Sequence, residues 1–310
     1  MSVAFLFPGQ GAQRPGMLHD LPLHDAVKAT LAEAADVLQR DVLLLDAAER
    51  LDSTVDVQLS LLIAAVATAR ALVAGAGRPA FVAGLSVGTF AAAVTARALG
   101  FEDALRLVRS RATLMERSFD AGYGLGAIVG LREADVVRLV ATIHDARTPL
   151  YIANINAPRQ IVVAGARAAI ATLLARALRA GASKAQALGV AVPSHCPLLE
   201  GVAERLTVEL RNVALHRPQL GYIGNRRCRM LRTADDVAEE LATNVAHQIR
   251  WHDATVLARE YGADLFVEMP PGHVLCDLAA VAFPDARAIA SDGAFGSAST
   301  LIERALATLP

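Results

Sequence analysis

The sequence predicts an α/β fold in which a parallel sheet carries helices and a second, smaller domain interrupts the chain. Apolar runs of strand length alternate with helical segments in the first third of the chain, which is typical of a parallel sheet covered by helices. The middle of the chain has a different order of elements, which indicates a separate unit. With 310 residues, of which 54% are hydrophobic and 20% are charged, the chain can bury a substantial core.

The first part of the large domain follows from apolar runs and helical periodicity. The run VAFLF at residues 3–7 ends at PGQG and predicts a buried strand, and AFVAGL at residues 80–85 predicts another. Expected helices span residues 25–40, 56–76, 88–98 and 103–119. The segment between Arg78 and Arg97 carries no charge and approaches the length of a membrane span. Pro79 and several glycines interrupt it, which favours a buried strand, a turn and a buried helix.

The middle of the chain predicts the order β-α-β-β-α-β, which is the ferredoxin-like arrangement. Its strands are expected at residues 126–131, 150–155, 160–165 and 184–192, and its helices at residues 132–144 and 167–180. We therefore place a small ferredoxin-like domain at residues 125–190. It is inserted in a large α/β domain formed by residues 1–124 and 191–310.

The last third returns to the large domain and is expected to be mainly helical. Helices are expected at residues 197–211, 234–246 and 251–261, strands at residues 264–269 and 288–291, and a turn at residues 270–275. The order completes a sheet with helices on its faces.

Composition excludes several classes of function. The net charge is -1 and no basic block stands out, which argues against a nucleic-acid surface. Cys196, Cys228 and Cys276 form no CxxC pair, so neither a disulfide framework nor a zinc site is expected, and no metal-ligand cluster is visible. The N-terminus has no basic segment before its short apolar run and is expected to be a strand, not a signal peptide. We expect a cytoplasmic protein without a membrane partner.

The stretch GLSVG at residues 84–88 contains the first candidate catalytic residue. A G-x-S-x-G pattern between a strand and a helix is typical of a nucleophile elbow, a sharp turn that exposes the serine hydroxyl at the edge of a sheet. The N-terminal N–H groups of the following helix suit a developing oxyanion. Ser86 is therefore a candidate nucleophile. The alternative is a small residue in a Gly- and Ala-rich packing segment.

A serine nucleophile needs a base, and the chain has eight histidines. His195 differs from the others because it follows an expected strand and lies between two prolines, in VAVPSHCPLL. This rigid loop falls at the expected domain junction, where pockets tend to form. A structural histidine remains the alternative. A dyad of His195 with Cys196 is not expected, because adjacent side chains of an extended segment point in opposite directions.

Arg111 lies on the apolar stripe of the helix expected at residues 103–119. Its neighbours at i±3 and i±4 are all apolar, namely Leu107, Val108, Leu114 and Met115. A buried guanidinium needs an anionic partner. The pattern alone favours an internal carboxylate or a side chain that reaches solvent, and the alternative is a substrate carboxylate held in bidentate geometry.

The motifs together resemble the malonyl-CoA:acyl carrier protein transacylase family over nearly the whole chain. They are FPGQGAQ at residues 7–13, GLSVG at 84–88, Arg111 followed by Met115, VPSH at 192–195 and PPGHVL at 270–275. The resemblance implies a hydrolase-like α/β domain with a ferredoxin-like insert. It also implies an S-malonyltransferase that needs no tightly bound cofactor and takes malonyl-CoA and an acyl carrier protein as partners.

The resemblance also implies roles for individual residues. Ser86 corresponds to the nucleophile, His195 to its base, and Arg111 to the residue that pairs with the malonyl carboxylate. The backbone N–H groups of Gln10 and Val87 correspond to the oxyanion hole. Further implied substrate-binding residues are Met115, Asn154 and Ser194, with Asn154 at the pantetheine arm.

Two departures from the fatty-acid-synthesis pattern bear on the acceptor. Leu85 stands where those members have histidine, in G-H-S-x-G. Asn244 stands where the family often has a glutamine whose backbone carbonyl orients the catalytic histidine. With YIANINAPRQIVVAG at 151–165 and VEMPPGHVL at 267–275, the chain looks most like the epsilon subunit of malonate decarboxylase, which loads a dedicated carrier subunit within a larger enzyme. The alternative is a transacylase of fatty-acid or polyketide synthesis.

These assignments predict a ping-pong acyl transfer through a malonyl-serine intermediate. An esterase-like serine hydrolase is the main competitor, and it would add an acidic triad member, for which Asp264 and Glu268 are the candidates. A non-catalytic scaffold that keeps only the fold is the third possibility, and the combined presence of Ser86, His195 and Arg111 argues against it.

Overall fold

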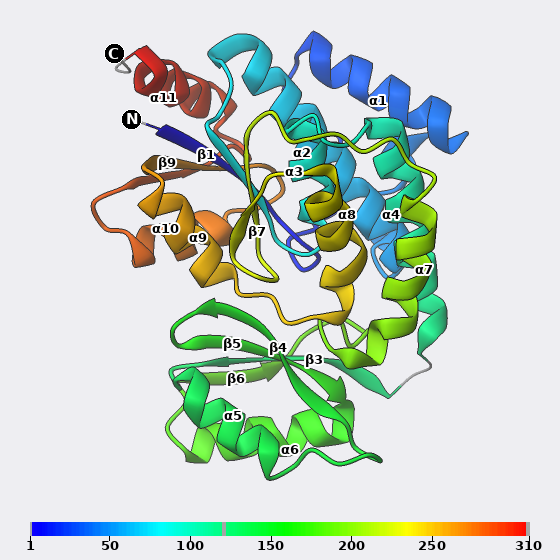
Figure 1. Cartoon of the computed structure of the whole chain (residues 1–310), viewed down its shortest axis with the longest axis vertical. Coiled ribbons are helices and arrows are strands. Elements are labelled where there is room, and N and C mark those ends of the chain that lie inside the picture. The colour runs from blue at the N-terminus through cyan, green and yellow to red at the C-terminus, as the bar shows by residue number, and fades with distance from the viewer. Residues whose placement is uncertain (1, 120–121, 308–310) are drawn as a thin grey trace.

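A six-stranded sheet forms the centre of the large domain, with strands in the order β10-β9-β1-β2-β7-β8. The computed structural model describes residues 2–119 and 122–307 (Figure 1). The strands are β1 Ser2–Phe7, β2 Phe81–Gly84, β7 Gly221–Gly224, β8 Arg229–Leu231, β9 Ala263–Glu268 and β10 Arg287–Ala290. They run parallel, except that β8 is antiparallel to β7. The expected α/β class with a parallel-sheet core is confirmed.

Helices cover both faces of this sheet, and the alternation of side chains along β1 shows why. Val3, Phe5 and Phe7 belong to the larger core cluster, whereas Ala4 and Leu6 pack into a second cluster. Both faces are apolar, as expected for parallel strands buried on both sides. The larger cluster is formed with α1 Asp25–Leu38, α2 Thr54–Ala76, α3 Gly88–Thr95, α4 Phe101–Ser118, α7 Glu200–Leu210, α8 Ala234–Thr243 and α11 Phe295–Ala307. The second is formed with α9 Trp251–Glu260 and α10 Val274–Ala282.

The long helix α2 is apolar enough to match a membrane span by length and composition, and it alone does so among residues 2–119 and 122–307. In the structure, 78% of its most apolar window is buried inside the protein. Its side chains pack against α1, α4 and α3. The helix is therefore apolar all round because it lies in the core.

The small domain is a four-stranded antiparallel sheet in the order β4-β5-β3-β6 (Figure 1). Its strands are β3 Tyr123–Val129, β4 Leu150–Ala157, β5 Gln160–Ala166 and β6 Lys184–Ala187. Helices α5 Glu133–Ala141 and α6 Arg167–Arg179 pack on the sheet and bury a separate apolar core. The order along the chain is β-α-β-β-α-β.

Several expected elements differ from the structure. The strand expected at 184–192 ends at Ala187. The Leu188 amide still donates to the Leu125 carbonyl of β3 at 2.9 Å, and the chain beyond it has no strand structure. The turn expected at 270–275 contains a cis peptide between Pro270 and Pro271 and leads into α10, which the sequence analysis missed. Strands β7 and β8 and helix α11 were not predicted from the sequence either. Helices expected at 197–211 and 234–246 each include a 3-10 turn, at Pro197–Leu199 and Asn244–Ala246.

The segment between α8 and α9 joins the two domains. The Ile155 amide of β4 donates to the Ile249 carbonyl at 2.8 Å, and the Ile249 amide donates to the Ala153 carbonyl at 2.8 Å. Arg250 adds an ion pair of 3.1 Å with Glu133 on α5. These contacts fix the small domain across the end of the large one, where the carboxyl ends of β1, β2 and β9 lie (Figure 1).

Candidate active site

Ser86 lies in the tight turn between β2 and α3. Its backbone has φ of 55°, in the left-handed region that a non-glycine residue rarely occupies. The turn is held by the Leu85 amide, which donates to the Phe7 carbonyl at 2.9 Å, and by the Gly88 amide, which donates to the Leu85 carbonyl at 2.9 Å. The strand-turn-helix context expected of a nucleophile elbow is therefore present in the structure.

The glycines on either side of Ser86 are required by close backbone contacts. A Cβ on Gly84 would lie 2.2 Å from the Gly88 carbonyl carbon, and a Cβ on Gly88 would lie 2.2 Å from the Phe7 carbonyl oxygen. Both neighbours are backbone atoms and cannot rotate away. The turn can therefore approach the end of β1 only because these two positions lack a side chain.

We expect Gly88→Ala to lower the free energy of unfolding by about 3 kcal/mol, because the clash with the β1 backbone outweighs the gain of about 1 kcal/mol in helix propensity. Urea unfolding followed by circular dichroism measures it. Gly201→Ala in α7 is the matched control, since a Cβ there meets nothing within 4 Å. The control should be as stable as the parent protein or more so, and equal stability of both variants would contradict the expectation.

His195 approaches Ser86 from the loop after the small domain. Its Nε2 lies 2.8 Å from Ser86 Oγ, and its Nδ1 lies 2.7 Å from the Asn244 carbonyl oxygen. A carbonyl only accepts, so Nδ1 carries the proton and Nε2 is free to accept from the serine hydroxyl. Burial, together with the nearby charge of Arg111, lowers the pKa of His195 to about 3. The imidazole is therefore a neutral base at physiological pH.

Arg111 completes this group from α4 and is fully buried. Its Nη2 donates to Ser86 Oγ at 3.2 Å, and its Nη1 donates to Gln58 Oε1 on α2 at 2.5 Å. No carboxylate pairs with Arg111 among the residues that the structure describes, so an internal acidic partner, which the pattern alone favoured, is wrong. Burial lowers its pKa to about 9, so it remains charged at neutral pH.

Neither acidic candidate for a triad contacts His195. Asp264 forms an ion pair with Arg259 at the start of β9. Glu268 accepts from the Cys276 amide at 2.8 Å. The competing hydrolase hypothesis would use one of them as a triad acid, but the Nδ1 position of His195 is taken by the backbone of Asn244. The Asn244 side chain instead donates to Thr89 Oγ1 at 2.9 Å and to the Ser86 carbonyl at 3.5 Å, which supports the turn.

Two backbone amides near Ser86 are the candidates for an oxyanion hole. Val87 is the N-cap residue of α3, and Gln10 follows Gly9, whose Cβ position would lie 3.3 Å from the Ser86 Cβ. Within residues 2–119 and 122–307, neither the Gln10 nor the Val87 amide donates a hydrogen bond. Two free N–H groups beside a serine and at a helix N-terminus can stabilise an oxyanion.

Known proteins match this chain over most of its length. An acyl transferase domain model matches residues 4–296. A malonyl CoA-acyl carrier protein transacylase of Escherichia coli is 34% identical over 281 residues, covering 89% of this chain and 91% of the relative. The chain belongs to the malonyl-CoA:acyl carrier protein transacylase family. A transacylase of the same name from Haemophilus influenzae is 33% identical and covers 92% of this chain and 94% of its own.

Solved structures of transacylases share the whole fold. The malonyl CoA-acyl carrier protein transacylase of Coxiella burnetii superposes with a TM-score of 0.93 at 32% identity, covering 98% of each chain. A malonyl-transacylase in complex with its type II PKS acyl-carrier protein gives a TM-score of 0.92 at 31% identity, covering 98% of this chain and 100% of that one. This transacylase family member is therefore an acyltransferase.

The remaining residues implied by the resemblance lie near Ser86, His195 and Arg111 of this transacylase. Asn154 on β4 lines a cavity of about 360 Å³ at the domain boundary, together with Gln10 and Leu85. Ser194 is buried directly before His195. Met115 contacts the group indirectly, since its Sδ accepts from Gln58 Nε2 at 3.4 Å.

Gln58 was not predicted from the sequence, and it links Met115 to the guanidinium of Arg111. The signal for it was a lone amide within a long apolar helix, since an uncharged polar side chain in such a place needs a buried partner. Within residues 2–119 and 122–307, no group of His, Cys, Asp and Glu could hold a metal ion.

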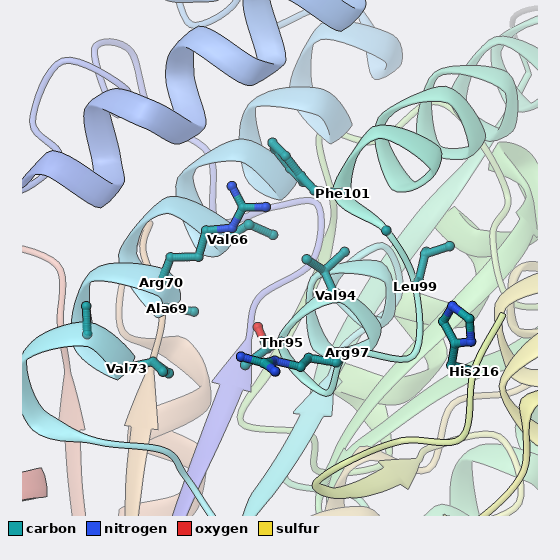
Figure 2. Close-up of a pocket in the computed structure, with 12 residues that line it drawn as sticks. Val66, Ala69, Arg70, Val73, Val94, Thr95, Arg97, Leu99, Phe101 and His216 are labelled. Carbon is teal, nitrogen blue, oxygen red and sulfur yellow. The ribbon is translucent and has the colours of Figure 1, made fainter. Parts of the chain in front are cut away.

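A second cavity, of about 480 Å³, lies at the far end of α3 from Ser86 (Figure 2). Figure 2 shows Arg70, Arg97 and His216 around apolar side chains of α2 and the α3–α4 connection. Arg70 is already paired with Glu33 at 2.6 Å and stacks 4.8 Å from the Phe101 ring centre. This cavity shares no lining residue with the one at the domain boundary, and none of the candidate site residues lines it.

Proposed function

We propose that this protein moves a malonyl group from malonyl-CoA to the thiol of an acyl carrier protein through a malonyl-Ser86 intermediate. The observation that carries the proposal is Arg111. A fully buried guanidinium without an acidic partner lies 3.2 Å from the hydroxyl of a serine that is also bonded to a neutral histidine. A substrate that brings its own carboxylate would supply the missing partner.

The first half-reaction acylates the serine. Arg111 pairs with the malonyl carboxylate and so brings the thioester carbonyl to Ser86. His195 Nε2 takes the hydroxyl proton as Oγ attacks, and the Gln10 and Val87 amides donate to the oxyanion. Each such donor contributes roughly 3–4 kcal/mol in a comparable site. The CoA sulfur then leaves and takes the proton from His195.

The second half-reaction returns the site to its starting state. The carrier thiol enters the place that CoA has left and gives its proton to His195 as its sulfur attacks the malonyl-serine carbonyl. The tetrahedral intermediate collapses, Ser86 Oγ takes the proton back from His195, and the malonyl thioester of the carrier departs. One base therefore serves both half-reactions, which is a ping-pong sequence.

For the acceptor, we propose a carrier of fatty-acid or polyketide synthesis. The relatives described above are named transacylases of the acyl carrier protein, and one was solved with its type II PKS carrier. The carrier subunit of malonate decarboxylase is the second candidate. Leu85 favours it, since an apolar side chain lines the boundary cavity where fatty-acid-synthesis members have histidine.

The test is direct transfer. The protein is incubated with malonyl-CoA and either a fatty-acid carrier or a decarboxylase carrier subunit, and the malonyl mass increment on each carrier is followed over time. Faster loading of the fatty-acid carrier supports the first proposal, and faster loading of the decarboxylase subunit supports the second. Hydrolysis of malonyl-CoA without loading of either carrier would contradict both.

A further inference from the structure

The cavity at the domain boundary collects three buried oxygens that lack a partner. They are Oδ1 of Asn154, Oδ1 of Asn156 and Oε1 of Glu268, and none has a hydrogen-bond partner among the described residues. All three residues line the same cavity of about 360 Å³. An unmade hydrogen bond of a buried polar group costs about 1–3 kcal/mol, so three at one place indicate a polar ligand.

The cavity leads to the catalytic group. Gln10 and Leu85 line it from the large domain. The Gln10 backbone amide donates no hydrogen bond among the described residues, and Leu85 directly precedes Ser86. Asn154 and Asn156 line it from β4 of the small domain, and Glu268 lies at the end of β9. A ligand in this cavity would therefore extend away from Ser86 between the two domains.

Glu268 is the unusual member because it is a fully buried acid without an ion pair among the described residues. Its Oε2 accepts from the Cys276 amide at 2.8 Å, which leaves Oε1 to carry the proton of the acid form. Burial raises the pKa of Glu268 to about 7. The titratable groups that act on it are His273 and Asp277 on the exposed side of the same segment, and the neighbouring Cys276.

The hydrogen-bonding capacity of the cavity matches a particular ligand chemistry. The acid form of Glu268 offers one donor, and the two asparagines offer acceptors. A thioester arm of the pantetheine type contains two amides, each with one carbonyl acceptor and one N–H donor. The malonyl carboxylate cannot be this ligand, since in the proposed reaction it pairs with Arg111, which does not line this cavity.

We propose that Glu268 is an arm-binding residue whose carboxylic acid donates a hydrogen bond to an amide carbonyl of the thioester arm, while Asn156 accepts from an amide N–H. The proposal rests on the proposed malonyl transfer and assigns a substrate contact to a glutamate that could otherwise be taken for a triad acid. The bond aligns the arm, and with it the thioester carbonyl, toward Ser86.

The experiment uses the full chain and compares Glu268→Gln with Glu268→Ala. Initial rates of carrier loading give KM and kcat for malonyl-CoA from about pH 6 to about pH 9. Glutamine keeps an acceptor for Cys276 and a donor for the arm at every pH. We expect KM of the parent to rise above a pH of about 7 as Glu268 ionises, while KM of Glu268→Gln stays flat.

Below a pH of about 7, Glu268→Ala should raise KM about fivefold to tenfold over the parent with little change in kcat, because one hydrogen bond to the arm is lost. The difference should shrink at higher pH, where the parent loses the same bond. A malonyl thioester of a simple alkanethiol, which has no amide, should be used equally well by the parent and both variants. Glu240→Gln is the matched control, since Glu240 is also buried and has a raised pKa but lies outside the cavity.

Two results would overturn the proposal. One is an unchanged KM in Glu268→Ala, and the other is a pH profile of Glu268→Gln that follows the parent. Failure of the proposed function gives a different result, since the parent would then load no carrier at any pH. Glu268→Gln keeps the bond to Cys276, so it tests the proposal even where the alanine variant folds poorly.

Discussion

Ser86→Ala is expected to lower the rate of malonyl transfer by about 10⁴-fold or more, because no covalent intermediate can form and His195 has no hydroxyl to deprotonate. Alanine can occupy the same left-handed turn at no greater strain than serine, so the fold should be retained. The rate of carrier loading measures the effect. Mass spectrometry of the protein after brief exposure to malonyl-CoA should show one malonyl increment on the parent and none on the variant.

The binding step provides the control for this variant. Arg111 and the boundary cavity are intact in Ser86→Ala, so malonyl-CoA should bind with a Kd within a few-fold of the parent, as calorimetry can measure. Ser297→Ala, at an exposed position of α11, should transfer at the parental rate. A Ser86→Ala variant that still forms a malonyl adduct would place the nucleophile elsewhere.

Arg111→Ala is expected to remove the preference for malonyl over acetyl. Loss of the partner of a buried carboxylate costs about 3–5 kcal/mol, so kcat/KM for malonyl-CoA should fall about 10²- to 10⁴-fold. Acetyl-CoA has no carboxylate to lose, and removal of the nearby positive charge raises the pKa of His195. Its kcat/KM should therefore stay constant or rise, as carrier loading from each thioester would show.

The same helix supplies the control for Arg111. Arg109→Ala removes an exposed arginine of α4 two residues away and should leave both rates unchanged. Arg111→Lys keeps the charge without the planar fork, and its malonyl rate should fall between those of the parent and the alanine variant. A full malonyl preference in Arg111→Ala would contradict the assigned role.

The sequence predicted the fold where each element has a simple pattern of its own. The apolar runs at 3–7 and 80–85 and the helices beside them needed only burial and periodicity. Strand β7 was missed because four residues with a glycine at each end carry little strand signal. Strand β6 is shorter than its apolar run, because residues after Ala187 are held by the domain boundary. Tertiary contacts determine where such a strand ends, and the local sequence pattern does not reveal those contacts.

The residues of the site also differ in whether a local sequence pattern reveals them. Ser86 and Arg111 could be selected from a turn motif and a helix stripe. The Asn244 carbonyl, which bonds His195, was expected only through the family resemblance, and Gln58, which bonds Arg111, was missed because it acts from another helix. A backbone carbonyl leaves no trace in the residue type. The sequence offered Glu268 as a triad acid for the same reason, since burial and distance from His195 appear only in three dimensions.

The carbonyl of Asn244 also has a consequence for the competition between acceptors. A carboxylate partner would stabilise the charged imidazole and make His195 strong enough to activate water. The Asn244 carbonyl is a neutral dipole and stabilises the charged imidazole less than a carboxylate would, so His195 stays a weak base. A thiol has a pKa of about 8.5, compared with about 15.7 for water, so it needs far less activation. In the proposed reaction, a malonyl-serine intermediate would therefore react with a thiol in preference to water, which would separate a carrier-loading enzyme from a hydrolase built on the same serine and histidine.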